Sequence, residues 1–272
     1  GQGVAIQLDG KIVVGGYVGH DDGSATDFAV VRYNPNGSLD TSFANGGKLT
    51  IFGYDDERGL GLALQPDGKI LIAGYSQSIG GQFILERLNA DGTLDSSFSD
   101  DGKVTTPLGW AVGLALQPDG KVLVVGTTNN SGSGSDFALV RYNSDGSLDT
   151  SFSDHGKAII DLGSTTDAAR SVALQPDGKI LLAGNTINFQ SGSDFALVRL
   201  NVDGSLDTTF SDDGVLATDF YGDYDEPRSI TVQPDGKILL AGYSFNGSNA
   251  DFALVRYNPD GSLDASFAHH GK

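Results

Sequence analysis

The segments LALQPDGKVLVVG (residues 114–126) and DFALVRYNSDGSLDTSF (residues 136–152) decide the fold, because they recur in this order five times along 272 residues. The glycine of the first turn stands at positions 10, 68, 120, 178 and 236, which gives spacings of 58, 52, 58 and 58 residues. A repeat of this length with one variable loop is typical of a four-stranded unit. We place the copies at approximately 1–58, 59–110, 111–168, 169–226 and 227–272 of a single domain that spans residues 1–272.

The apolar pattern indicates short strands in every copy. Residues 61–64 alternate small and large side chains, whereas residues 179–184 and 136–143 are apolar on both faces, so their sheet is buried on both sides. Gln-Pro-Asp-Gly and Asn-x-Asp-Gly are typical of type I turns with a left-handed glycine. The outer strand is the least regular, and we expect it near residues 46–52, 101–107, 155–161 and 213–219. No segment has helical periodicity, and small sheets covered on both faces predict a β-propeller.

The last copy stops early. Lys272 aligns with Lys48, where the outer strand of the first copy begins. We therefore predict an all-β propeller with five blades of four antiparallel strands, the last blade lacking most of its outer strand. A larger ring with more sequence is the alternative, and a neighbouring chain or domain is a candidate source of the missing strand. Because Gly1 lies in mid-pattern, we expect the chain to be a segment of a longer precursor.

Composition excludes several classes of function. The chain carries 35 acidic and 17 basic residues, a net charge of −18, and this charge disfavours a nucleic-acid partner. It has no cysteine, which excludes disulfides, zinc–thiolate sites and thiol nucleophiles. No apolar run approaches the roughly 18 residues of a membrane span.

The pattern LALQPDGKILxAG…DFALVRYNxDGSLDTSFxxxGK closely resembles the delta-60 repeat, a bacterial repeat, over essentially the whole chain. Its layout is also similar to the NHL repeat of β-propellers, with an apolar strand, an x-D-G turn, a second apolar strand and a second x-D-G turn. The resemblance implies a propeller within a large secreted or surface-attached bacterial protein, and it implies no catalytic residues. The second copy departs from the pattern at Gln82 and Glu86.

Oxygen-rich positions are the candidates for a metal. The aspartate that opens the third strand recurs at Asp27, Asp136, Asp194 and Asp251, where a structural carboxylate bonded to backbone or to a repeat arginine such as Arg32 is the simpler interpretation. The turn residues Asn258, Asp260 and Asp264 place three oxygen-bearing side chains within seven residues. The EF-hand spacing is absent, so the sequence assigns no cofactor and leaves calcium as an alternative.

Two sets of side chains are candidates for ligand binding. Arg58, Trp110, Arg170 and Arg228 precede the first strand of their copies, near the expected channel mouth, and Arg and Trp are frequent interface anchors. The loops after the second strand carry the aromatic residues Tyr17, Tyr75, Phe189 and Tyr243 among Ser, Asn and Gly, a composition that also suits sugars.

No catalytic motif is present. The four histidines occupy unrelated repeat positions, no serine sits in a nucleophile elbow, and no phosphate-binding glycine loop occurs. Carboxylate clusters such as Asp55/Asp56/Glu57 and Asp223/Asp225/Glu226 leave a glycoside-active enzyme as the least favoured alternative. We predict a non-enzymatic structural or protein-interaction module of a secreted or cell-surface bacterial protein, with a carbohydrate-binding propeller as the alternative.

Overall fold

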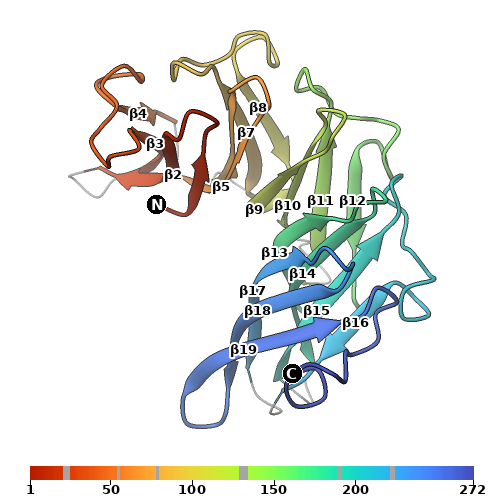
Figure 1. The fold of residues 1–272 in the computed structure, drawn as a ribbon. Coiled ribbons are helices and arrows are strands. Elements are labelled where there is room, and N and C mark those ends of the chain that lie inside the picture. Colours follow the sequence, from red (N-terminus) through yellow and green to blue (C-terminus); the bar gives the residue numbers. More distant parts are fainter. Residues whose placement is uncertain (21–24, 54–55, 78–79, 129–133, 189–191, 221–223) are drawn as a thin grey trace. The chain divides into compact units, whose positions relative to one another are not determined.

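We describe residues 1–20, 25–53, 56–77, 80–128, 134–188, 192–220 and 224–272 in a computed structural model. These residues form 19 β-strands (Figure 1). None of them belongs to a helix long and apolar enough to cross a membrane.

The strands form five antiparallel sheets in sequence order. The first contains β1 (Gly3–Ile6), β2 (Ile12–Gly19), β3 (Thr26–Tyr33) and β4 (Lys48–Ile51), and the second contains β5 (Glu57–Leu64), β6 (Ile70–Ser76), β7 (Gln82–Leu88) and β8 (Lys103–Pro107). The third contains β9 (Gly109–Leu116), β10 (Val122–Thr128), β11 (Phe137–Tyr142) and β12 (Lys157–Ile160), and the fourth contains β13 (Asp167–Leu174), β14 (Ile180–Asn188), β15 (Gly192–Leu200) and β16 (Val215–Thr218). The fifth contains β17 (Asp225–Val232), β18 (Ile238–Phe245) and β19 (Ala250–Tyr257).

This architecture confirms the predicted all-β fold. Within every sheet, consecutive strands are hydrogen-bonded neighbours, and the fifth sheet has three strands, as the early stop of the last copy predicts. The outer strands β4, β8, β12 and β16 lie inside the four ranges expected for them. The first strands of copies two to five begin four residues earlier than the repeat pattern indicates, at Glu57, Gly109, Asp167 and Asp225.

The chain divides into two compact units. Unit 1 contains Gly1–Val124 and Arg141–Asp149, and unit 2 contains Val125–Val140 and Thr150–Lys272. The two units are described separately below.

Both turns of the repeat have the backbone that their glycines predict. In the first turn of the second copy, the Gly68 amide donates to the Gln65 carbonyl at 2.9 Å, and Gly68 has a φ of +85°. In the second turn, the Gly92 amide donates to the Asn89 carbonyl at 2.9 Å with a φ of +91°. Any other residue would be strained at these angles, so glycine fixes the register of each hairpin.

Phenylalanine from one sheet packs onto glycine of the next. Phe28 is fully buried, and a Cβ atom at Gly74 would come within 2.7 Å of its ring. In unit 2, a Cβ at Gly184 would come within 2.6 Å of the Phe137 ring. A Cβ at these glycines would come closer still to the backbone carbonyls of Arg58 and Ala168 in the first strand of the same sheet. The small residues of the second strand are therefore required both by their own sheet and by the neighbouring one.

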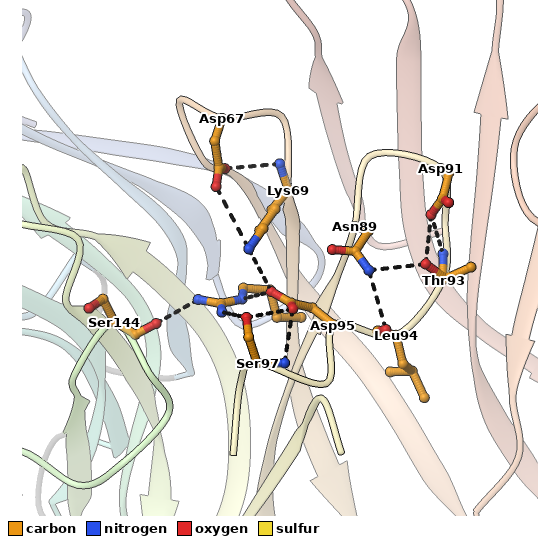
Figure 2. Close-up of polar contacts among 10 residues, drawn as sticks. Asp67, Lys69, Asn89, Asp91, Thr93, Leu94, Asp95, Ser97 and Ser144 are labelled. Atoms are coloured by element: carbon orange, nitrogen blue, oxygen red, sulfur yellow. Dashed lines mark hydrogen bonds and ion pairs between the residues drawn. The ribbon is translucent and has the colours of Figure 1, made fainter. Parts of the chain in front are cut away.

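A buried ion-pair network recurs in every copy, and Figure 2 shows it in the second. The Asp95 carboxylate lies 2.6 Å from Arg87 Nε and 2.8 Å from Lys69 Nζ, and it also accepts a hydrogen bond from the Ser97 hydroxyl at 2.7 Å. Arg87 donates to the Ser144 carbonyl in the second turn of the next copy at 2.5 Å (Figure 2). The network therefore ties the third strand of one sheet to a turn of its neighbour.

The equivalent aspartates share this environment. The pKa of Asp95 and of Asp207 is held well below the usual range, because a lysine, a hydroxyl (Ser97 for Asp95, Thr209 for Asp207) and an arginine outweigh the opposing effect of burial. Asp40 and Asp264 show the same direction, led by the hydroxyl of Ser42 for Asp40 and by Lys237 for Asp264. These carboxylates are ionised in the folded protein at every pH near neutrality.

Glu86 is the main irregularity of the core. It is fully buried where the other copies carry valine, and neither of its carboxylate oxygens has a hydrogen-bond partner among the described residues. Its one close cation is Lys103, 3.4 Å away, which also contacts Glu57 at 3.0 Å. Burial raises the pKa of Glu86 to about 7, and the nearby Glu57 adds to the rise.

Replacing Asp95 by Asn should destabilise the protein by about 3 kcal/mol at pH 7, because Arg87 and Lys69 would lose their buried anion. The difference in unfolding free energy from wild type should shrink as the pH falls below about 4. In that range Asp95 becomes protonated in the unfolded wild type but stays ionised in the folded protein, which lowers the stability of wild type. Urea unfolding between pH 3 and 7 measures both effects. The exposed Asp67→Asn variant, which should cost less than about 0.5 kcal/mol, is the control. Equal losses in the two variants would contradict the assignment.

Replacing Glu86 by the valine of the other copies should stabilise the protein, and the gain should grow with pH. A carboxyl group whose pKa is higher in the folded than in the unfolded state contributes its full stability to the fold only below the unfolded pKa. For Glu86 this contribution is lost as the pH rises through about 7. We expect a gain of about 1–3 kcal/mol at pH 8.5 and less at pH 5.5, measured by denaturant unfolding. The Glu86→Gln variant keeps the shape of the side chain and removes its charge, so it separates the two contributions to stability. A gain independent of pH would show that Glu86 is not the titrating group.

Candidate functional site

The four residues predicted to precede the first strand lie within it. Arg58 is opposite Tyr75 in the β5–β6 pair, and Glu226 is opposite Tyr243 in the β17–β18 pair, so Arg58 and Glu226 are equivalent. The pairing shifts between Ala169 and Ser171, and again between Pro227 and Ser229. Arg170 and Arg228 are therefore bulge residues, two positions further along than Arg58 and Trp110. The spacing to the turn glycine shows the same offset, because Arg58 and Trp110 stand ten residues before Gly68 and Gly120, whereas Arg170 and Arg228 stand eight before theirs.

The bulges direct both arginines of unit 2 to Glu226. A β-bulge inserts an unpaired residue and re-aims its side chain. Arg170 Nε lies 2.7 Å from Glu226 Oε1, and Arg228 lies 3.1 Å from the same oxygen. The hydroxyls of Tyr224 and Tyr243 donate to Glu226 Oε2 at 2.9 and 2.7 Å. These five residues form what we call the Glu226 cluster.

The Glu226 cluster is a charged centre with an aromatic rim. The Tyr224 and Tyr243 rings are stacked with centroids 6.1 Å apart, and the Arg228 guanidinium lies 5.5 Å from the Tyr243 ring centre. Glu226 itself is buried, whereas Tyr224 is 40 % exposed and the Arg228 side chain is 60 % exposed. A ligand would therefore meet the tyrosine and the arginine before it met the carboxylate.

The electrostatics of the cluster keep Glu226 ionised. Burial works to raise its pKa, but the Tyr243 hydroxyl, Arg170, the Tyr224 hydroxyl and Arg228 together outweigh burial and lower it. Burial and the adjacent Glu226 raise the pKa of Tyr224 to about 12. Since Oε2 accepts two hydrogen bonds and Oε1 is ion-paired with two arginines, the Glu226 carboxylate is poorly suited to act as a general acid or as a nucleophile.

Tyr243 is the residue of the predicted aromatic set that belongs to this cluster. Tyr17, Tyr75 and Tyr243 were expected in loops, but they lie within the second strands β2, β6 and β18, because those strands extend further than the apolar pattern indicates. The Tyr17 ring lies 5.5 Å from the guanidinium of Arg58, which also pairs with Asp56 at 3.4 Å. Trp110 is half-buried on β9. Phe189, Asp55 and Asp223 lie outside the described residues.

Unit 1 contains an apolar groove that the sequence analysis did not identify. Its volume is about 860 Å³, and its apolar lining includes Ile6, Leu8, Leu64 and Leu116. Ile6 is 70 % exposed and Leu8 is completely exposed, at 102 %. Leu8 occupies the turn position at which the other four copies carry proline, so the sequence did contain a signal for this site.

The turn residues proposed for calcium are bonded to their own hairpin. Asp260 accepts from the amide and hydroxyl of Ser262, and the Asn258 side chain donates to Ser262 and to the Leu263 carbonyl. Asp264 pairs with Arg256 and Lys237, each at 2.7 Å. Their equivalents Asn89, Asp91 and Asp95 have matching contacts in Figure 2. The repeat arginines thus bind this later aspartate rather than the aspartate that opens the third strand.

The opening aspartates have other surroundings. Asp27 accepts a hydrogen bond from the Gly53 amide at 3.1 Å and lies 2.5 Å from His20 Nε2. Asp136 and Asp194 instead each converge with two further carboxylates, Asp161 and Asp167 in the first case and Asp219 and Asp225 in the second. These two trios are the groups of metal-ligating side chains that the described part of the chain brings together, and spacing along the sequence gives no sign of them.

Comparison with solved structures shows the fold. A protein of unknown function from Bacteroides caccae is 13 % identical with a TM-score of 0.52, and the match covers 98 % of this chain and 82 % of that one. Puromycin hydrolase is 16 % identical with a TM-score of 0.54, covering 96 % and 38 %. Drosophila Plexin A in complex with Semaphorin 1b is 11 % identical with a TM-score of 0.51, covering 95 % and 51 %. The chain thus spans less than two fifths of the hydrolase and about half of the plexin.

Identities this low show the architecture alone. No curated protein sequence matches the chain. The family described as "Domain of unknown function (DUF5122) beta-propeller" matches residues 7–43, 65–98, 117–152, 175–210 and 233–267, which are the two turns and intervening strands of all five copies. The chain therefore belongs to this β-propeller family.

Proposed function

We propose that the chain is a non-enzymatic protein-interaction module of a secreted or cell-surface bacterial protein. Its ligand is an apolar segment of a partner protein that also carries positive charge, and this segment binds in the groove of unit 1. The observation that carries the proposal is the exposure of Ile6 and Leu8 on the wall of that groove.

The groove has the character of a protein-binding surface. Isolated exposed apolar residues are common, but exposed side chains that line a shared apolar concavity mark interaction sites. Leu64 and Leu116 continue the same surface from the second and third sheets. Leu8 also stands where proline would serve the turn equally well, so its side chain is not needed for folding.

The charge of the groove favours a basic partner. Asp9, Asp67 and Asp91 lie on its lining and are exposed. The two basic residues on the lining, Lys11 and Arg32, pair with Asp40 at 3.0 and 2.7 Å. Together with the net charge of −18, this arrangement attracts cationic segments and repels acidic ones.

The state of the buried acids supports a non-enzymatic role. Glu226 accepts hydrogen bonds on Oε2 and is ion-paired through Oε1, and the aspartates of the repeat network are ion-paired. Glu86 has a pKa near that of a catalytic acid, but it is fully buried.

Carbohydrate binding at the Glu226 cluster is the second candidate function. Its support is the exposed Tyr224 face, stacked on Tyr243 and bordered by the Arg228 guanidinium, because sugars bind to aromatic faces that have polar neighbours. A glycan array compares wild type with Tyr224→Ala. Binding that the substitution abolishes would favour this function, and an empty array would remove it.

Panning a random dodecapeptide library on the wild-type protein should enrich peptides that combine aliphatic or aromatic residues with Lys or Arg. Synthetic versions of these peptides should bind Leu8→Asp at least about tenfold more weakly, since a buried leucine anchor contributes at least about 1.4 kcal/mol. Leu8→Pro, the residue of the other copies, should also weaken binding and leave the melting temperature unchanged or higher. Fluorescence anisotropy measures the affinities, and thermal melts report on folding.

Val202→Asp is the matched control, because it places the same charge at an exposed apolar turn position in unit 2. It should leave peptide affinity unchanged. Enriched peptides that bind the Leu8 variants and wild type equally would exclude the groove, and an absence of enrichment would argue against the proposed function.

A further inference from the structure

Three carboxylates of unit 2 converge at one end of the fourth and fifth sheets. Asp194 lies on β15, Asp219 follows β16, and Asp225 is the first residue of β17. One carboxylate oxygen from each lies within 4.8 Å of the others. Asp194 and Asp225 are buried, whereas Asp219 is exposed and leaves the cluster open to solvent. Like charges this close repel one another unless a cation or a proton lies among them.

Two buried polar atoms at this position lack the partners that burial requires. Asp225 is completely buried, and its Oδ2 accepts a hydrogen bond from the Phe220 amide at 2.8 Å. Its Oδ1 has no hydrogen-bond partner among the described residues. Ser244 lies opposite Asp225 in the β17–β18 pair and is 1 % exposed. Its hydroxyl is near enough to lower the pKa of Asp225, but it makes no well-formed hydrogen bond with any of the described residues. Buried polar atoms are almost always satisfied, so these two atoms indicate a missing ligand.

Burial is the main cause that raises the pKa of Asp225, and Asp219 adds to the rise. The Phe220 amide, the nearby Ser244 hydroxyl and Lys272 work in the opposite direction. The Lys272 ammonium group donates to the backbone carbonyl of Asp219 and lies 5.5 Å from the centre of the Phe220 ring.

Hard divalent cations fit this set of donors. Ca²⁺ takes six to eight oxygen ligands from carboxylates, hydroxyls, carbonyls and water, and tolerates irregular geometry. Three carboxylates with a buried hydroxyl beside them supply a large part of that shell, and solvent reaches the remainder past Asp219. We propose that Asp194, Asp219 and Asp225 form a calcium-binding site that satisfies Asp225 Oδ1 and joins the fourth sheet to the fifth.

The third copy provides an internal comparison. Asp136, Asp161 and Asp167 occupy the equivalent positions and also converge. Asp167, however, accepts hydrogen bonds on both oxygens, from the Leu162 amide at 2.9 Å and from the Ser164 hydroxyl at 2.5 Å. Because a cation would compete with these donors, this second trio should bind calcium more weakly than the first.

Calorimetric titration of the chelator-treated full chain tests the proposal with Ca²⁺ alone and with Mg²⁺ alone. We expect one tighter Ca²⁺ site and weaker Mg²⁺ binding. Calcium at a hundredfold excess over its dissociation constant should raise the melting temperature by roughly 5 °C. Asp225→Asn should abolish the tighter site and the calcium-dependent shift, and without calcium it should melt at the wild-type temperature or above, because a repulsive buried charge is gone.

Asp194→Asn is a second variant that should lose the same response. Asp167→Asn and the exposed Asp212→Asn should keep the tighter site. Wild-type protein that gives no binding heat and identical melts with calcium and with chelator would overturn the proposal. An Asp225→Asn variant that binds calcium like wild type, or an Asp167→Asn variant that alone loses the tighter site, would overturn it as well.

Discussion

The ion pair between the third-strand arginine and the aspartate eight residues later is the interaction on which the repeat depends. Arg87 is held by Asp95 through Nε and donates through Nη1 to the Ser144 carbonyl in the next copy's turn. Arg32 and Arg199 make the same contact with Ala90 and Pro259. A sheet that is buried on both faces is stable only beside another sheet. The arginine links neighbouring sheets with a charged hydrogen bond. Because this bond is buried, removing one of its partners would lower the stability of the protein strongly.

This requirement explains which positions vary. The turn glycines, the buried phenylalanines and the arginine network recur because each is needed where sheets meet. Residues away from those contacts are free to differ, and the candidate sites lie there. Leu8 replaces a turn proline, the Glu226 cluster forms around bulge residues, and the Asp225 trio lies where one outer strand gives way to the next first strand. In this repeat, stability depends on the regular positions, and the proposed binding sites combine regular positions such as Asp194 with departures such as Leu8 and Glu226.

The sequence predicted the regular part of the structure well, because that part is local. Turn glycines and alternating apolar residues determine hairpins within a few residues of chain, and the early stop after Lys272 predicted the three-stranded fifth sheet. The sites required contacts that no local pattern encodes. The bulges at Arg170 and Arg228 leave the repeat spacing unchanged, and Asp194 meets Asp225 only after two strands have paired. Leu8 could have been identified from the sequence, because the other four copies carry proline at this turn position. The delta-60 resemblance and the surface location remain predictions.

Hydrogen exchange measured by mass spectrometry on wild type and Asp95→Asn tests most directly whether the arginine network joins neighbouring sheets. In wild type, the Ser99 amide donates to the Asp145 carbonyl in the turn that Arg87 also contacts. The account predicts faster exchange in Asp95→Asn both around residues 95–102 and in the turn at residues 143–147, with little change in β2 or β3. Faster exchange confined to residues 95–102, with the turn at 143–147 unaffected, would contradict it.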